Sequence, residues 1–193
     1  MNFSLRAAFL ASLIYSAPAF SQAADAPVIA LQPHPTQPEW TKVCAQPGDR
    51  QNCYITRDFV SGTGKAVLAI GYYQLRQPTE RVIGRILLPL GLSLPAGVRV
   101  AIDDAPPVSG QFSTCVPTGC FAEFPLTPAL TEKFKRGDVI RIAAKNQFLS
   151  EIGFVAPLTG FSSAFDGRAV TDQVLATRQD NLRRHMQETA ASR

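Results

Sequence analysis

The sequence contains very little histidine, tryptophan and methionine. Only two of its 193 residues are histidines, His34 and His185, and there are one tryptophan and two methionines. Histidine is the side chain that most often moves protons in catalysis and a frequent ligand of metals. His34 stands in a proline-rich stretch and His185 in a polar tail, so we expect neither to be held rigidly beside a reacting atom. The sequence therefore predicts a protein that is not an enzyme, with no catalytic residues, no cofactor and no metal site.

The sequence also lacks any run of the ~20 apolar residues that a membrane-spanning helix requires. A short apolar stretch, Ala7–Tyr15, follows a positive charge at Arg6 and precedes several small residues. This order is typical of a secretory signal peptide. We expect residues 1–23 to be that signal peptide. Cleavage after Ala23 is favoured because the mature protein would then begin with polar residues, and cleavage after Ala19 is the alternative. The mature protein is then periplasmic or secreted, with no transmembrane segment.

Charge of one sign is not concentrated in any part of the chain. The formal net charge is +4 at pH 7, and removal of residues 1–23 takes away only Arg6, which leaves +3. The basic residues form no long cluster of the kind that marks a nucleic-acid-binding segment. We therefore expect no nucleic-acid partner, and contact with an anionic surface only as a peripheral interaction.

Four cysteines are present, Cys44, Cys53, Cys115 and Cys120. An even number in an exported chain predicts disulfides, because thiols pair in an oxidising compartment. Of the three possible pairings we prefer Cys44–Cys53 with Cys115–Cys120, because each closes a short loop that a hairpin or tight turn can bring together. Neither pair has the Cys-x-x-Cys spacing, which argues against zinc and against thioredoxin-like redox chemistry.

The distribution of proline divides the chain into parts. Four prolines lie between Ala26 and Glu39, which is too many for a regular helix or a central strand. We expect residues 24–39 to form an extended, proline-rich arm that serves as a linker. One globular β domain is predicted over residues 40–166, followed by a C-terminal helix or tail over residues 167–193.

After Trp40 the sequence alternates between apolar runs and turn residues, which is typical of an all-β domain. The expected strands are 40–45, 51–60, 65–75, 81–88, 98–102, 110–115, 120–125, 138–145 and 152–155. A short helix is expected over Pro128–Lys135, with Thr127 as its N-cap, and good helix formers predict a C-terminal helix within Phe161–Arg193. The predicted fold class is all-β, a disulfide-stapled β-sandwich of about eight short strands with a C-terminal α-helix.

Two groups of charged residues could either bind a ligand or have a structural role. Asp103 and Asp104 are adjacent in a proline-terminated loop without the alternating ligands of a calcium loop, so we interpret them as turn residues. Arg76, Arg81 and Arg85, together with exposed aromatic residues, would line a groove if the protein bound a small molecule or glycan. The alternation along the strands instead favours aromatic residues in the core.

Four motifs occur in order along the globular region. They are Trp40-x-x-x-Cys44; Ile86-Leu87-Leu88-Pro89-Leu90-Gly91-Leu92-Ser93-Leu94 with Gly97-Val98-Arg99-Val100-Ala101-Ile102-Asp103; Phe112-x-x-Cys115 through Gly119-Cys120-x-Ala122; and Pro157-Leu158-Thr159-Gly160-Phe161-x-x-Ala164-Phe165. Together they span Trp40 to Phe165, nearly the whole globular region. In these motifs the chain resembles the invasion-associated locus B family.

The resemblance implies an exported envelope protein, because this family is secreted or periplasmic, occurs widely in α-proteobacteria and is named for members linked to host-cell invasion. It provides no catalytic residues to carry over. Our first hypothesis is a non-enzymatic protein that binds an envelope or host-surface protein and supports host invasion or envelope integrity. The alternative is a periplasmic small-molecule or glycan-binding module. The proline-rich arm and the tail after Arg168 look less typical of the family, so we expect any partner specificity to reside there.

Overall fold

The computed structural model describes residues 26–45, 52–75 and 80–191. The expected signal peptide and Arg76 lie outside these residues. The strands are β1 (Val28–Pro33), β2 (Thr41–Ala45), β3 (Asn52–Ser61), β4 (Ala66–Leu75), β5 (Arg81–Leu88), β6 (Val98–Ile102), β7 (Val108–Val116), β8 (Gly119–Pro125), β9 (Val139–Lys145) and β10 (Glu151–Pro157). The helices are a 3-10 turn η1 (Leu94–Ala96), α1 (Pro128–Arg136), α2 (Phe161–Asp166) and α3 (Asp172–Ala191).

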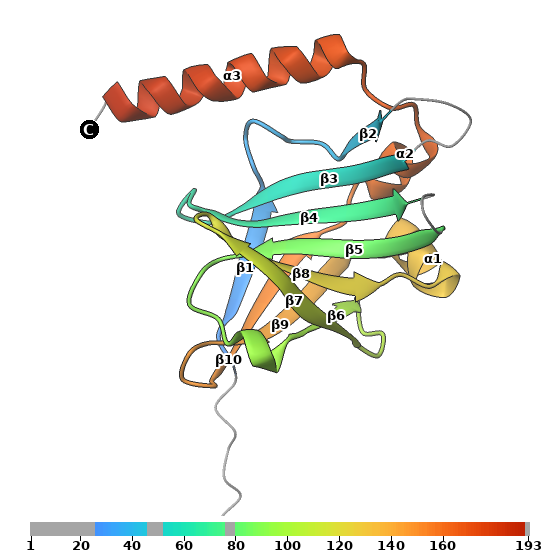
Figure 1. Ribbon diagram of the computed structural model, residues 1–193, viewed down its shortest axis with the longest axis vertical. Coiled ribbons are helices and arrows are strands. Elements are labelled where there is room, and N and C mark those ends of the chain that lie inside the picture. Colours follow the sequence, from blue (N-terminus) through green and yellow to red (C-terminus); the bar gives the residue numbers. More distant parts are fainter. Residues whose placement is uncertain (1–25, 46–51, 76–79, 192–193) are drawn as a thin grey trace, which may run out of the picture.

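The strands form a closed barrel rather than the expected two-sheet sandwich (Figure 1). The sheet runs in the order β1-β10-β9-β6-β7-β8-β5-β4-β3-β2, and β1 also pairs with β3. This second pairing joins the two ends of a nine-strand ring, and β2 pairs with another part of β3. The prediction of a sandwich is wrong because alternating strands supply one apolar face in either architecture, so their pattern does not reveal whether the sheet closes.

The strand that closes the barrel comes from the proline-rich arm. β1 pairs in parallel with β10 through Val28–Ala30 and antiparallel with β3 through Leu31–Pro33. The linker interpretation is therefore wrong over Val28–Pro33. The physical reason is the position of the prolines: Pro27 precedes the strand and Pro33 is its last residue, so the residues between them keep the N–H groups that strand pairing needs.

Side chains that point inward from the strands fill the barrel, and along a strand they alternate with side chains that point outward. β6 and β9 bury every second residue, as the period of two along a half-buried strand requires. The large side chains that are fully buried are Phe59, Phe124, Phe134, Phe154, Phe161, Ile55, Ile70, Ile86, Leu88, Ile102, Ile140 and Ile142. Of the aromatic residues among them, Phe59, Phe124 and Phe154 lie on strands, as strand alternation predicts, whereas Phe134 and Phe161 lie on helices.

Both disulfides join residues that face each other across paired strands. Cys44 on β2 is bonded to Cys53 on β3, and Cys115 on β7 is bonded to Cys120 on β8. The corresponding Cα–Cα distances are 4.1 and 4.0 Å. This is the pairing that the sequence favoured, and it staples two β-hairpins.

Helix α1 closes one end of the barrel and begins where the sequence predicts. The Thr127 side chain accepts a hydrogen bond of 3.2 Å from the Leu130 backbone N–H, and Pro128 occupies the first turn. A threonine N-cap satisfies a helix donor, and proline at the start loses no internal hydrogen bond. The buried Leu130 and Phe134 turn the apolar face of the helix towards the barrel.

The C-terminal region contains two helices where the sequence analysis expected one. The short helix α2 ends at Asp166, and α3 begins at Asp172. Gly167 has an extended backbone, and its N–H bonds the Ser163 carbonyl, which ends the first helix. Phe161 of α2 is buried in the barrel, whereas α3 extends along one side of it (Figure 1). Within the described residues, none of the helices combines the length and apolar character needed to span a bilayer.

Alkaline pH is expected to destabilise the fold through Tyr72. This side chain is buried, and burial raises its pKa above the ordinary value, while a hydrogen bond with Thr131 and the charge of Lys135 oppose the shift. Because the pKa of Tyr72 is higher in the folded state than in the unfolded state, its contribution to stability is fully present below the unfolded-state pKa of about 10. The contribution is lost as the pH rises through the folded-state pKa. Tyr72→Phe should therefore flatten the fall in unfolding free energy, measured by urea titration between about pH 9 and 11. Equal falls in both proteins would contradict this assignment.

Candidate functional site

The turn between β9 and β10 holds two large apolar side chains in solvent. Phe148 is 77% exposed and Leu149 is 63% exposed. The Asn146 side-chain oxygen accepts hydrogen bonds from the backbone N–H groups of Phe148 (2.9 Å) and Ser150 (3.0 Å). Leu149 has a φ of 62°, a left-handed conformation that is costly for a bulky residue. The turn is therefore held in a defined shape although its apolar residues gain nothing from burial.

The loop after β5 lies against this turn. The Gln147 N–H donates to the Gly91 carbonyl at 3.0 Å, and the Ser93 N–H donates to the Lys145 carbonyl at 2.8 Å. These contacts place Leu90, which is 58% exposed, beside the β9–β10 turn. Two loops that are distant in the chain thus contribute to one surface.

We call the three side chains Leu90, Phe148 and Leu149 the apolar tip. Next to the turn, Lys145 ends β9, and Arg99 on β6 forms an ion pair with Glu151 on β10; Arg141 lies further along β9. An apolar surface of this kind on a folded protein is typical of a contact site. The small local charge makes the apolar tip more suitable for a protein surface than for anionic lipid, which attracts basic residues.

His34 takes part in a local turn. His34 Nδ1 accepts a hydrogen bond from the Thr36 N–H at 3.2 Å and lies 2.7 Å from the Thr36 hydroxyl, so it stabilises its own turn. His185 belongs to α3. In the part of the chain that the structure describes, no three His, Cys, Asp or Glu residues gather as metal ligands.

The Asp103–Asp104 pair is explained by turn formation. Asp103 Oδ1 accepts hydrogen bonds from the backbone N–H groups of Asp138 (3.1 Å) and Val139 (3.0 Å). The backbone of Asp103 is left-handed, with a φ of 50°, a conformation that aspartate tolerates better than most residues. The carboxylate therefore fixes the loop after β6 to the start of β9.

Arg85, one of the arginines proposed for a ligand groove, is held by an ion pair and by aromatic rings. Arg85 Nε donates to the Glu123 carboxylate at 2.9 Å, and its guanidinium lies over the rings of Tyr73 and Phe121, 5.2 and 5.7 Å from their centroids. Burial raises the pKa of Tyr73, and the Arg85 charge opposes that shift. The contacts of Arg85 therefore lie on the barrel wall, on strands β4, β5 and β8. Arg81 is exposed at the start of β5.

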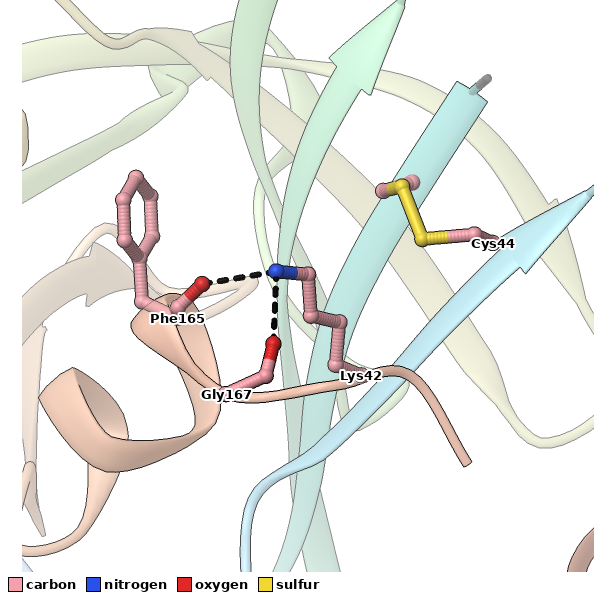
Figure 2. The surroundings of a disulfide bond; sticks show 5 residues. Lys42, Cys44, Phe165 and Gly167 are labelled. Atoms are coloured by element: carbon pink, nitrogen blue, oxygen red, sulfur yellow. Dashed lines mark hydrogen bonds between the residues drawn. A yellow bond between two sulfur atoms is a disulfide. The ribbon is translucent and has the colours of Figure 1, made fainter. Parts of the chain in front are cut away.

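The C-terminal tail leaves the barrel next to the first disulfide. Figure 2 shows Lys42 reaching from β2 to the end of α2, where its Nζ donates to the carbonyls of Phe165 (2.7 Å) and Gly167 (3.0 Å). The Val170 N–H then donates to the Lys42 carbonyl at 2.9 Å. Cys44 lies on the same strand and is bonded to Cys53 of β3. The hydrogen bonds of Lys42 fix the path of the chain towards α3.

Sequence reasoning missed Phe148 and Leu149 as candidate functional residues. The available signal was a pair of large apolar residues inside a turn, after Asn146 and before Ser150, between two expected strands. Leu90 had been noted within a family-like motif, but its exposure beside the other loop depends on the tertiary structure.

Comparisons with known proteins agree on one family. The sequence model described as "Invasion associated locus B (IalB) protein" matches residues 40–169. Two invasion protein B homologs from Brucella abortus, from strain 2308 and from biovar 1 strain 9-941, are each 32% identical over 134 residues. Each alignment covers 68% of this chain and 76% of the relative.

A solved structure shares the fold. The crystal structure of invasion associated protein B from Bartonella henselae superposes with a TM-score of 0.57 at 19% sequence identity. The match covers 73% of this chain and 93% of that protein. At this level of identity the similarity shows a common architecture.

Proposed function

Because the chain belongs to the invasion associated locus B (IalB) protein family, we propose that it is an exported envelope protein, periplasmic or secreted, that acts by binding another protein. Its role is in host invasion or envelope integrity, and it is not an enzyme. The names of the Brucella relatives support the link to invasion. Residues 1–23 support export through their signal-like order of charge, apolar stretch and small residues.

The apolar tip is the observation that carries the binding proposal. Phe148 and Leu149 are held in solvent by a turn with fixed backbone hydrogen bonds. Aromatic side chains dominate the energetics of protein interfaces when they enter a pocket on the partner. A rigid turn also loses little conformational entropy on binding, so an exposed phenylalanine there is a suitable anchor.

Site-specific photo-crosslinking tests the proposal in the source organism. A photoreactive phenylalanine analogue replaces Phe148, and the same analogue replaces Val116, an exposed apolar residue of the β7–β8 hairpin. We expect a discrete protein adduct from position 148 in the envelope or on host cells, identified by mass spectrometry. Lipid adducts alone, identical adducts from position 116, or no adduct at either position would contradict a protein partner at the tip.

The double substitution Phe148→Ser with Leu149→Asn should abolish competition for that partner. Asparagine tolerates the left-handed backbone of position 149, and both side chains are exposed, so unfolding free energy should change by no more than about 0.5 kcal/mol. Val116→Ser is the matched control and should compete as well as the original protein. Retained competition by the double variant would remove the tip from the interface.

A genetic comparison tests the biological role. We expect deletion of the gene, and its replacement by the tip double variant, to reduce the same property, either host-cell entry or resistance of the envelope to detergent. Loss of neither property after deletion would contradict the proposed role. If the double variant fully restores the property that the deletion strain has lost, the proposed role stands but the apolar tip is not needed for it.

A further inference from the structure

A small cavity lies between helix α3 and the outer wall of the barrel. Its volume is about 180 Å³. The loop after β1, strands β2 and β3, and helix α3 supply its walls, and Figure 1 shows α3 lying over these two strands. Sites for drug-sized ligands usually have a volume of about 300–1,000 Å³, so this cavity suits a smaller group, of the size of one side chain.

Three side chains of β3 with different chemistry line the cavity. They are Tyr54, Thr56 and Asp58. These residues alternate with buried residues of the same strand, so they point outward from the barrel. Val43 of β2 also lines the cavity and is paired with Tyr54, and directly paired residues of antiparallel strands share one face. Along β3 the lining therefore changes from apolar at Val43 and Tyr54, through the Thr56 hydroxyl, to a carboxylate at Asp58.

The Asp58 side chain stands at one end of the cavity and is accessible to solvent. Within the described residues, no hydrogen bond or ion pair reaches its carboxylate. Partial burial raises the pKa of Asp58 above its ordinary value, and the charge of His34 opposes that shift. His34 itself bonds the Thr36 N–H through its Nδ1. An anion that has lost part of its water without gaining a partner favours a cation from outside the chain.

Helix α3 forms the outer wall of the cavity. Leu175 and Gln179 line it, and residues four positions apart lie on the same face of a helix. Leu175 is half-buried, whereas every other α3 side chain that the structure describes is exposed. The helix follows residues 40–169, which match the family model. This wall is therefore supplied by the C-terminal tail of this chain, outside the matched family domain.

We propose that this cavity, which we call the Asp58 pocket, binds a primary alkylammonium group, the chemistry of a lysine side chain or of a free aliphatic amine. The ammonium donates to the Asp58 carboxylate, in a charge-assisted hydrogen bond that is stronger than a neutral one. The alkyl chain lies along Thr56 towards the apolar end at Val43 and Tyr54. Asp58 and Tyr54 are four residues apart, about 13 Å along an extended strand, so a short alkyl chain fits between their side chains. The pocket shares no residue with the apolar tip and adds a second contact site to the protein.

Titration of the backbone amide resonances of Thr56 and Asp58 by nuclear magnetic resonance tests the proposal. The oxidised, ¹⁵N-labelled protein is titrated with n-butylammonium chloride, with Nα-acetyl-lysine methylamide and with 1-butanol at constant pH and ionic strength. We expect saturable shifts of both resonances with an alkylammonium compound. Butanol has an alkyl chain of the same length as butylammonium but no charge, so its binding should be weaker by about tenfold or more.

The two sources of the ammonium group give different results. Saturation by the lysine compound, with or without saturation by butylammonium, would assign the pocket to a lysine side chain of a polypeptide. Saturation by butylammonium alone would assign it to a free amine. If neither ammonium compound shifts the resonances saturably, or if butanol binds as tightly as butylammonium, the proposal is overturned.

Two exposed aspartates provide a matched pair of variants. Asp58→Asn keeps the shape of the side chain but removes the charge, so it should weaken alkylammonium binding by about tenfold or more. Asp104 is also exposed but does not line the cavity, so Asp104→Asn should leave the affinity unchanged. The far-ultraviolet circular dichroism of both variants should match that of the original protein. Equal affinities of the two variants would exclude Asp58 as the residue that binds the ammonium.

Two glutamines of α3 test the outer wall of the pocket. Gln179→Lys brings an ammonium group of the chain itself to the cavity, where it should compete for Asp58 and weaken binding of added amine by about tenfold or more. Gln173 is exposed on the same helix but does not line the cavity, so Gln173→Lys makes the same change in net charge and should leave the affinity unchanged. Equal affinities of these two variants would overturn the assignment to the cavity beneath α3. If Asp58→Asn does not fold, this comparison still decides the proposal.

Discussion

Replacing Phe161 by alanine should lower the free energy of unfolding by about 3–5 kcal/mol, the usual cost of removing a large aromatic side chain from a core. Phe161 is fully buried at the start of α2. Its ring lies 5.1 Å from Trp40, 5.3 Å from Phe134 and 5.7 Å from Tyr72, measured between centroids. These partners come from the start of the domain, from α1 and from β4, so one side chain joins three distant segments.

Urea unfolding at 25 °C measures this loss. Phe148→Ala removes the same atoms from an exposed position and should change the unfolding free energy by no more than about 0.5 kcal/mol. Phe161→Leu retains part of the volume and should fall between the two. A loss below about 1 kcal/mol in Phe161→Ala would show that this aromatic cluster contributes far less than core packing normally does.

Removing either disulfide is expected to cost about 2–3 kcal/mol of unfolding free energy. Cys44 and Cys53 are separated by 9 positions, and Cys115 and Cys120 by 5. Both bridges close short loops, and the stabilisation from restricting the unfolded chain grows only slowly with loop length. The two bridges should therefore contribute similar amounts, although Cys120 is buried and Cys115 is exposed.

Paired alanine substitutions separate the two bridges. Cys44→Ala with Cys53→Ala, and Cys115→Ala with Cys120→Ala, avoid placing an unpaired hydroxyl at a buried position. The reduced original protein should lose about as much stability as a variant that lacks both bridges, since the entropic term is the same in both cases. Equal unfolding free energies of the reduced and oxidised original protein would contradict a structural role for the bridges.

The sequence predicted the strands well because their signal is local. The ranges expected from alternating apolar residues overlap β2 to β10, since a strand with one buried face needs a period of two wherever it lies. The same reasoning applies to α1, where Thr127 and Pro128 give the start of the helix directly. The pairing of Cys44 with Cys53 and of Cys115 with Cys120 was accessible because each pair belongs to one hairpin.

Part of the C-terminal region could also be inferred from local signals. The helix formers after Phe161 indicated helix, and both α2 and α3 occur there. The sequence analysis missed the break between the two helices at Gly167, because the contacts that accompany its extended backbone come from residues far away in the chain. Lys42 of β2 bonds the Gly167 carbonyl, and its own carbonyl accepts from Val170, and neither contact leaves a periodic pattern in the sequence.

The sequence by itself determined the all-β character, the disulfides and the family of this protein. Tertiary structure alone decided that β1 closes the barrel, because its pairing with β10 and β3 joins segments whose separation along the chain hides their proximity. It likewise decided the apolar tip, where Leu90 meets the β9–β10 turn, and the cavity that Trp40, Arg57 of β3 and Ser163 of α2 line together. The physical reason is that periodicity and capping act over a few residues, whereas closure, exposure and a shared cavity depend on which distant segments pack together.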